Sequence, residues 1–127
     1  MNTAIATDTA PPSFSDYAQA VETPPGARLV HISGQVGVTP DGTLPDDAQA
    51  QHEQAWRNIF AILHAADMAP TDIIDVLAIV TSADGVPVFR QSRDKMLPGH
   101  LACSTLLVCG LANPAWKVEI AVKAAKA

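Results

Sequence analysis

The sequence PAWKVEIAVKAAKA, residues 114–127, ends the chain and carries its clearest strand pattern. Within it the apolar side chains of Val118, Ile120 and Val122 alternate with polar or small ones. Such an alternation is typical of a strand that buries one of its two faces. The polar face carries one carboxylate, Glu119, among lysines. Glu119 is therefore either a solvated surface residue or part of a binding site, and the alternation alone leaves both interpretations open.

The strongest helix pattern lies at residues 45–68, PDDAQAQHEQAWRNIFAILHAADM. Asp46 and Gln49 have the spacing of a capping box, which favours a helix start there. One apolar stripe follows, formed by Trp56, Ile59, Phe60, Leu63 and Ala66. The polar residues expected largely off this stripe are Gln51, Glu53, Gln54 and Arg57. Because Pro70 bars continuation, we expect the helix to end near Asp67.

Five further segments complete the fold pattern. Residues 27–38 and 71–85 are rich in branched apolar side chains and predict strands, the second with both faces covered. Residues 86–99 carry prolines near both ends and predict a second helix. Two closing strands are expected near 103–109 and 116–123. This order of elements predicts an α+β domain with two helices on one face of a small mixed sheet.

The composition predicts one folded domain spanning residues 1–127, with residues 1–15 loosely ordered. Of the 127 residues, 48% are hydrophobic and 17% are charged, which is typical of a globular chain. The net charge of -5 and the lack of a basic cluster argue against a nucleic-acid partner. No segment has the basic and apolar regions of a signal peptide or the roughly 18 apolar residues of a membrane span. We therefore expect a cytoplasmic protein without a membrane partner.

The two cysteines, Cys103 and Cys109, lie in one apolar run. On a single strand they would be roughly 20 Å apart, whereas a disulfide requires Cα atoms within about 7 Å. We expect no bridge between them and interpret both as buried, unreactive thiols. A nucleophilic Cys103 is the alternative.

No motif predicts a metal or phosphate site. The four histidines, His31, His52, His64 and His100, lack the spacing of metal ligands. Gly34 and Gly37 lack the spacing of a phosphate-binding loop, so a bend or bulge in a strand explains them better. The chain also has no G-x-S-x-G motif of a serine hydrolase.

Four segments, in the correct order, together resemble the RidA/YjgF family of small trimeric proteins. They are DYAQAV (16–21), ISGQVGV (32–38), AQHEQAWRNIFAILHAADM (50–68) and VEIAVKA (118–124). The likeness covers nearly the whole chain. It implies a chorismate-mutase-like α+β fold in which three chains pack their sheets into a central barrel with the helices outside. Ligand clefts lie between the subunits of such trimers.

The resemblance also implies a chemistry and a set of site residues. Archetypal family members hydrolyse small reactive imines and enamines to keto acid and ammonia, without a metal or any other cofactor. By position, Glu119 would place the attacking water or proton and Tyr17 would complete the catalytic pocket. Ser33 and Gly34 belong to the Ser-Gly-Gln strand that lines the substrate in such proteins.

One position departs from the family pattern. Alignment of the strand near residue 103 sets Ser104 where the archetypal members carry a substrate-binding arginine. A serine hydroxyl offers one neutral donor in place of a planar charged fork. The pair Ser104 and Thr105 resembles that of divergent family branches, and both are expected to bind substrate. The candidate cations to replace the arginine, some from a neighbouring subunit, are Lys117, Lys123, Arg90, Arg93 and Lys95.

Two functions from different classes follow. The first is a cofactor-free deaminase or hydrolase of a small imine-like or enamine-like metabolite, acting at clefts between subunits. The second is a non-catalytic trimer that binds a small metabolite or regulates through it. A ribonuclease, a role attached to some relatives, is disfavoured by the acidic balance and the low aromatic content of 5%.

Overall fold

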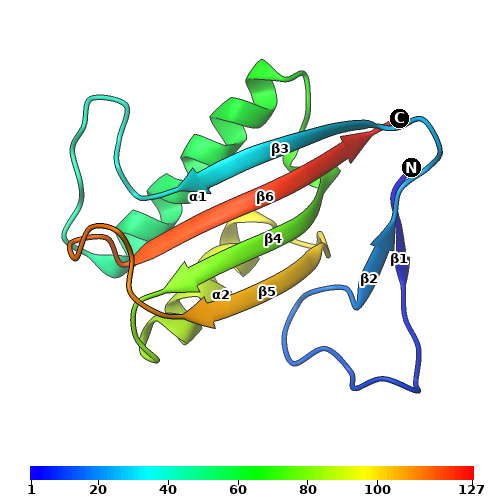
Figure 1. The fold of residues 1–127 in the computed structure, drawn as a ribbon, viewed down its shortest axis with the longest axis horizontal. Coiled ribbons are helices and arrows are strands. Elements are labelled where there is room, and N and C mark those ends of the chain that lie inside the picture. The colour runs from blue at the N-terminus through cyan, green and yellow to red at the C-terminus, as the bar shows by residue number, and fades with distance from the viewer.

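The computed structural model describes residues 1–127 and contains two helices that cover one face of a four-stranded sheet (Figure 1). The strands are β1 (Thr3–Ile5), β2 (Ala20–Glu22), β3 (Arg28–Gln35), β4 (Ile73–Val80), β5 (Cys103–Val108) and β6 (Val118–Lys126). The helices are α1 (Ala48–Ala65) and α2 (Gly85–Met96), and a short 3-10 helix, Pro70–Asp72, leads into β4. The α+β class predicted from the sequence is confirmed.

The last strand of the chain lies inside the sheet. The strand order is β3-β6-β4-β5, with β6 antiparallel to both neighbours and β4 parallel to β5. Val118, Ile120 and Val122 of β6 face the helices and are buried. The period-two pattern therefore predicted both the strand and its buried face correctly.

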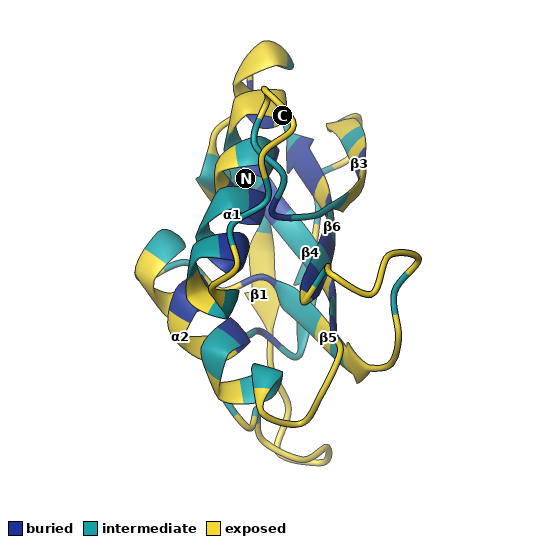
Figure 2. Ribbon diagram, turned by 90° about the vertical axis from the view of Figure 1, so that its left-hand side faces the viewer, coloured by how far each residue is buried: buried dark blue, intermediate teal, exposed yellow.

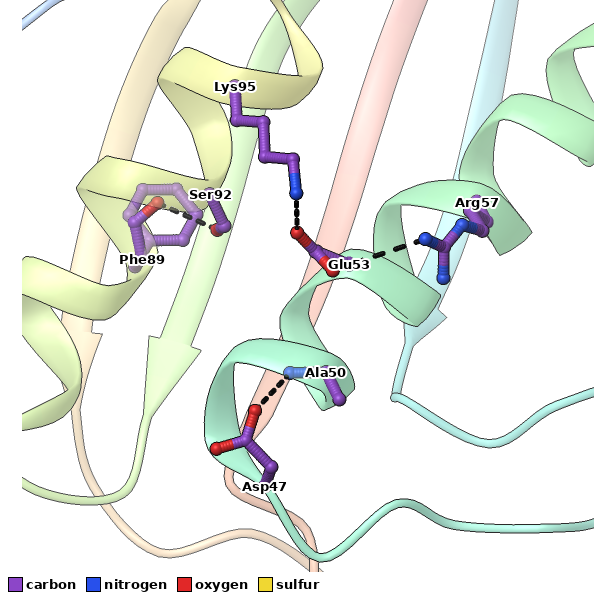
Figure 3. Close-up of polar contacts among 7 residues, drawn as sticks. All are labelled: Asp47, Ala50, Glu53, Arg57, Phe89, Ser92 and Lys95. Atoms are coloured by element: carbon purple, nitrogen blue, oxygen red, sulfur yellow. Dashed lines mark hydrogen bonds and ion pairs between the residues drawn. The ribbon is translucent and has the colours of Figure 1, made fainter.

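The N-cap of helix α1 lies one residue later than the sequence suggested. Asp47, and not Asp46 with Gln49, is the N-cap, because its carboxylate accepts a hydrogen bond of 2.9 Å from the backbone N–H of Ala50 (Figure 3). At the other end, Asp67 has a φ of 56°, so the helix stops before it. Of the predicted stripe, the residues that are fully buried are Trp56, Ile59 and Leu63.

Gln51 was expected to be off the apolar stripe, but only 1% of it is exposed. Its amide Nε2 donates to the carbonyls of Pro45 and Ala115, and its Oε1 accepts the backbone N–H of Lys117. A buried amide is tolerated when its polar atoms are satisfied in this way. Gln51 therefore ties the start of α1 to the loop that leads into β6.

Helices α1 and α2 contact each other through an apolar layer and a polar edge. Phe89 of α2 packs on Trp56 with ring centroids 6.4 Å apart. At the surface, Lys95 of α2 donates to Glu53 of α1, and Arg57 lies 4.0 Å from the same carboxylate (Figure 3). The hydrogen bond from Lys95 is the main cause that lowers the pKa of Glu53. Exposed ion pairs of this kind add little stability, so the apolar layer holds the helices together.

Strand β4 is covered on one face only, contrary to the expectation from its apolar run. Val76, Ala78 and Val80 are buried against the helices, whereas Leu77 points the other way and is 40% exposed. Figure 2 shows the buried segments gathered where the helices meet the sheet. The second face of the sheet is thus open within one chain.

The N-terminal segment contains two short strands that the sequence pattern did not predict. β1 pairs with β2 in an antiparallel hairpin, which lies beside one end of the main sheet (Figure 1). The side chain of Asn2 adds a hydrogen bond of 3.0 Å to the carbonyl of Ala125 in β6. The start of the chain is thereby held near its end. No helix of the chain is long and apolar enough to cross a membrane.

Candidate functional site

The open face of the sheet, which is turned toward the viewer in Figure 1, brings together most of the predicted site residues. Strand register aligns Leu107 of β5, Ile79 of β4 and Glu119 of β6 in one row across this face. Gly34 of β3 lies beside Glu119 and ends the row. Glu119 is half-buried here, between an apolar pair and the backbone of β3.

The side chain of Glu119 occupies the space that a side chain at Gly34 would need. A Cβ added at Gly34 would overlap Oε2 of Glu119 and would lie 2.8 Å from its Cδ. The register of β3 against β6 shifts between Ile32 and Gln35, which indicates a bulge at this point. The sequence interpretation of Gly34 as part of a strand bulge is therefore correct. Only glycine leaves room for the carboxylate against the strand.

Next to this row lies a cavity of about 320 Å³ on the same face. Ser33 and Thr105, both predicted as substrate-binding residues, line it together with Leu77. At its far side Lys123 pairs with Asp75 at 3.8 Å. The cavity therefore combines hydroxyl groups, an apolar floor and one ion pair, which suits a small polar molecule.

The two lysines expected beside Glu119 have other partners. Lys123 pairs with Asp75, and the Nζ of Lys117 donates to the backbone carbonyl of Asp46 at 2.8 Å. Neither forms an ion pair with Glu119. The carboxylate thus remains available to a ligand.

Ser104 and Tyr17 lie on the opposite side of the sheet from Glu119. Ser104 is aligned with Val76, a core residue, so its side chain points toward the helices. It lines a second cavity of about 200 Å³ together with Tyr17. Within one chain, neither Ser104 nor Tyr17 can act as a hydrogen-bond partner of Glu119, because the sheet separates them. The expectation that they serve Glu119 directly requires a second subunit.

A sequence model described as Endoribonuclease L-PSP matches residues 7–126 of the chain. The 2-iminobutanoate/2-iminopropanoate deaminase of Escherichia coli K12 is 35% identical over 103 residues, which cover 80% of this chain and 78% of that protein. The chain belongs to the RidA/YjgF family. The family resemblance inferred from four sequence segments is thus confirmed.

Solved structures of RidA/YjgF proteins share the whole fold. A Rid-family protein of unknown function, YyfB from Yersinia pestis, has a TM-score of 0.86 at 27% identity and covers 98% of both chains. RidA from an Antarctic Psychrobacter has a TM-score of 0.72 at 29% identity over 96% of this chain and 98% of that one. The YjgF protein of Escherichia coli has a TM-score of 0.73 at 26% identity over 98% of this chain and 99% of that one.

The cysteines of this RidA/YjgF chain are both free, as expected, but they are less buried than the sequence suggested. Cys109 is exposed, and Cys103 is half-buried on the open face. Burial, and then the charge of Asp75, raise the pKa of the Cys103 thiol. A thiol that stays protonated at neutral pH is a poor nucleophile, which argues against the alternative role for Cys103.

Sequence reasoning missed one unusual polar side chain near the core. His52 of α1 is fully buried, and its Nδ1–H donates to the carbonyl of Ala48 at 2.7 Å. Its Nε2 has no partner. Burial lowers the pKa of His52 below its usual 6.5. The imidazole is therefore neutral near pH 7, and its ring centroid lies 6.3 Å from that of Phe89.

A further cavity lies away from these residues. It measures about 590 Å³ and lies between the N-terminal segment, the loop at His100 and the C-terminus. None of the predicted site residues lines it. No group of three or more His, Cys, Asp and Glu side chains is placed to hold a metal ion.

Proposed function

We propose that this RidA/YjgF protein is a cofactor-free deaminase that hydrolyses a small imine, or an enamine in equilibrium with it. The observation that carries the proposal is the half-buried carboxylate of Glu119, which lies against Gly34 beside an open cavity. A relative that is 35% identical is named 2-iminobutanoate/2-iminopropanoate deaminase, which supports the same class of reaction here.

In the proposed reaction Glu119 acts as general base toward water. As the water oxygen bonds to the imine carbon, Glu119 accepts a proton from the water and passes it to the imine nitrogen, giving a carbinolamine. The C–N bond then breaks as Glu119 takes the hydroxyl proton of the carbinolamine and gives it to the departing nitrogen, so that ammonia and the carbonyl product leave. Ser33 and Thr105 are the substrate-binding hydroxyls in this scheme. A positioned acid–base group of this kind typically contributes 10²–10⁴-fold to rate.

The test is hydrolysis of 2-iminobutanoate generated in the assay, followed through ammonia release. We expect the wild-type protein to hydrolyse the imine faster than the uncatalysed rate, and Glu119→Gln to lower the catalysed rate about 100-fold or more. Glu53→Gln is the matched control, because Glu53 lies on the helix surface and pairs with Lys95. Equal rates for Glu119→Gln and the natural chain would contradict the role of Glu119.

We also propose that three copies pack their open sheet faces together and that the sites lie in the clefts between them. Leu77 and Leu107 support this arrangement, since they are 40% and 45% exposed in the single chain and point away from the helices. Burying such side chains is a main source of association energy. Leu77→Asp should convert a trimer to monomers in light scattering, whereas Ile62→Asp on the outer side of α1 should not.

A second candidate is a trimer that binds a small metabolite without converting it. The β5 side chains on the same face as Glu119 are those of Cys103, Thr105 and Leu107, and none carries the positive charge that would clamp a carboxylate substrate. Saturable binding of 2-oxobutanoate with no turnover of its imine would favour this function over catalysis.

A further inference from the structure

A cavity of about 290 Å³ lies where the two helices begin. Ala48, the first residue of α1, and Gly85, the first residue of α2, both line it. In Figure 1 the two helix starts lie at the end of the sheet where β4 stops and β6 begins. None of the residues proposed for imine hydrolysis lines this cavity, so it is separate from the site of Glu119.

The start of α2 leaves several backbone donors without a partner. Ser82, Ala83 and Asp84 precede this helix of 12 residues, and the backbone N–H of each donates to no acceptor in the chain. The side chain of Asp84 makes no capping hydrogen bond either. The first N–H groups of a helix carry a partial positive charge and attract anions. The start of α2 therefore offers hydrogen-bond donors to the oxygens of an anionic group.

Three side chains add donors to the same cavity. Lys117 lines it, and its Nζ donates to the carbonyl of Asp46 at 2.8 Å. An ammonium group has three N–H donors, so two of them remain for a ligand. Thr81 and Ser82 also line the cavity, and both are exposed, so their hydroxyls can turn toward a ligand.

The inner wall of the cavity has an unsatisfied acceptor. His52 lines the cavity and is fully buried. Because its Nδ1–H donates to the carbonyl of Ala48, its Nε2 carries a lone pair, and this lone pair has no partner. Leaving a buried acceptor without a hydrogen bond is costly. A ligand that satisfies His52 must therefore bring a hydrogen of its own.

Asp84 is a second acceptor at this cavity. It is the one carboxylate among the lining residues, and it forms no ion pair. A carboxylate repels a fully ionised anion, but it accepts a hydrogen bond from an anion that keeps a hydroxyl group. The cavity thus combines donors for anionic oxygens with two acceptors for a hydrogen. A phosphate group that keeps one proton matches both, whereas sulfate at neutral pH has no hydrogen to donate.

We propose that this cavity binds a singly protonated phosphate group, either as inorganic phosphate or in a small phosphomonoester. The N–H groups before α2, the two hydroxyls and Lys117 donate to its oxygens, and its P–OH group donates to His52 or Asp84. One water molecule takes up about 30 Å³ of liquid, so the cavity also has room for a short organic group on the phosphate. The proposal does not depend on imine hydrolysis.

The test is calorimetric titration of the full chain in a phosphate-free buffer at neutral pH and constant ionic strength. The probes are inorganic phosphate, glycerol 3-phosphate and sulfate. We expect saturable binding of a phosphate probe, with sulfate bound at least tenfold more weakly. Tighter binding of glycerol 3-phosphate assigns the site to a phosphomonoester, and equal or tighter binding of inorganic phosphate assigns it to the free ion. No saturable binding of either, or sulfate bound as tightly, would overturn the proposal.

Two variants test the donors. Lys117→Met should weaken phosphate binding about tenfold or more, since it removes a charge-assisted contact. Ser82→Ala removes a neutral donor and should weaken it about threefold to tenfold. Lys95→Met is the control with the same charge change, because Lys95 pairs with Glu53 away from the cavity. Unaltered affinity in both cavity variants would overturn the proposal.

The two acceptors are tested together. Asp84→Asn replaces one acceptor by an amide that can also donate, so the preference for phosphate over sulfate should fall about tenfold. In the wild-type protein, the nitrogen NMR signal of His52 Nε2 should move on addition of phosphate, because its lone pair gains a hydrogen bond. The signals of His31 and His64, which lie outside the cavity, should stay in place. An unchanged preference together with an unmoved His52 signal would overturn the recognition of a P–OH group.

Discussion

The two faces of the main sheet are built from the same strands but behave differently. On the helix side, Val76, Val80 and Ile120 are sealed in the core. On the other side, Leu77 is exposed within one chain and Glu119 is half-buried against Gly34. Successive side chains of a strand point to opposite faces, so each strand contributes alternately to the core and to the open face. Stability and function are thus separated at the level of single positions.

The largest expected difference between the faces is in the stability lost when a large apolar side chain is shortened. Ile120→Ala should lower the free energy of unfolding by about 2–5 kcal/mol, because it leaves a cavity in the core. Leu77→Ala removes a side chain of similar size from the open face and should cost less. Because the burial of Leu77 depends on association, the stability lost in this variant should also shrink on dilution, as the natural protein itself dissociates. Urea titrations at two protein concentrations measure both effects. Equal and concentration-independent losses would contradict the division of the sheet.

Two glycines of the β3 region provide a second comparison. A Cβ at Gly37 would lie 2.6 Å from the backbone oxygen of Gln51, so Gly37→Ala should cost about 1–3 kcal/mol of stability by forcing the backbone apart. A Cβ at Gly34 meets only the flexible side chain of Glu119. Gly34→Ala should therefore displace the carboxylate and reduce imine hydrolysis with a smaller loss of stability. Thermal unfolding and turnover are measured on both variants. A larger loss of stability in Gly34→Ala than in Gly37→Ala, with turnover retained, would contradict this expectation.

A positive charge placed at either of two neighbouring positions on β5 tests the same difference between the two faces of the sheet. Thr105→Arg adds a cation on the face of Glu119 and should raise kcat/KM for a carboxylate-bearing imine about tenfold, equivalent to about 1.4 kcal/mol. Ser104→Arg adds one on the helix side, beside Arg90 and Arg93. There, like-charge repulsion should lower stability and leave kcat/KM without that gain. Steady-state kinetics that favour Ser104→Arg instead would contradict the strand register.

The smallest expected effect is a pH dependence from the buried histidine. Because the pKa of His52 is lower in the folded chain than its usual 6.5, the unfolded chain binds more protons as the pH falls below that value. Stability should therefore fall between about pH 7 and pH 5, by at most about 1.4 kcal/mol per pH unit from this group. His52→Gln should flatten the slope, whereas His31→Gln on the open face should retain it. Urea midpoints across this range provide the measurement.

Sequence patterns predicted the parts of this fold in which local chemistry and burial agree. The alternation around Ile120 and the apolar stripe at Trp56 each have a clear period, so the strand, the helix and their buried faces were found. Gln51 was missed because a buried amide looks polar until its hydrogen-bond partners are known. Strand β1 was missed because three residues carry too little periodicity.

The sequence names candidate site residues but does not reveal their arrangement. Glu119 and Gly34 were both identified by position, and their contact depends on a strand bulge that only three dimensions reveal. The face of Ser104 could not be read from the run CSTLLV, which has no alternation of polar and apolar residues. A one-residue uncertainty in such a strand exchanges the two faces. The second cavity escaped notice because its arginines and Tyr17 are far apart in the sequence.

The central place of β6 has a consequence for how the protein is made. Since β6 follows β3 and β4 in the sequence and lies between them in the sheet, residues up to Lys126 must leave the ribosome before the sheet can be joined. Until then β3 and β4 each expose a strand edge with unpaired backbone groups, which is a target for aggregation and for chaperones. Premature termination near residue 117 would remove the strand that unites the sheet, so a chain that stops there should yield no folded product.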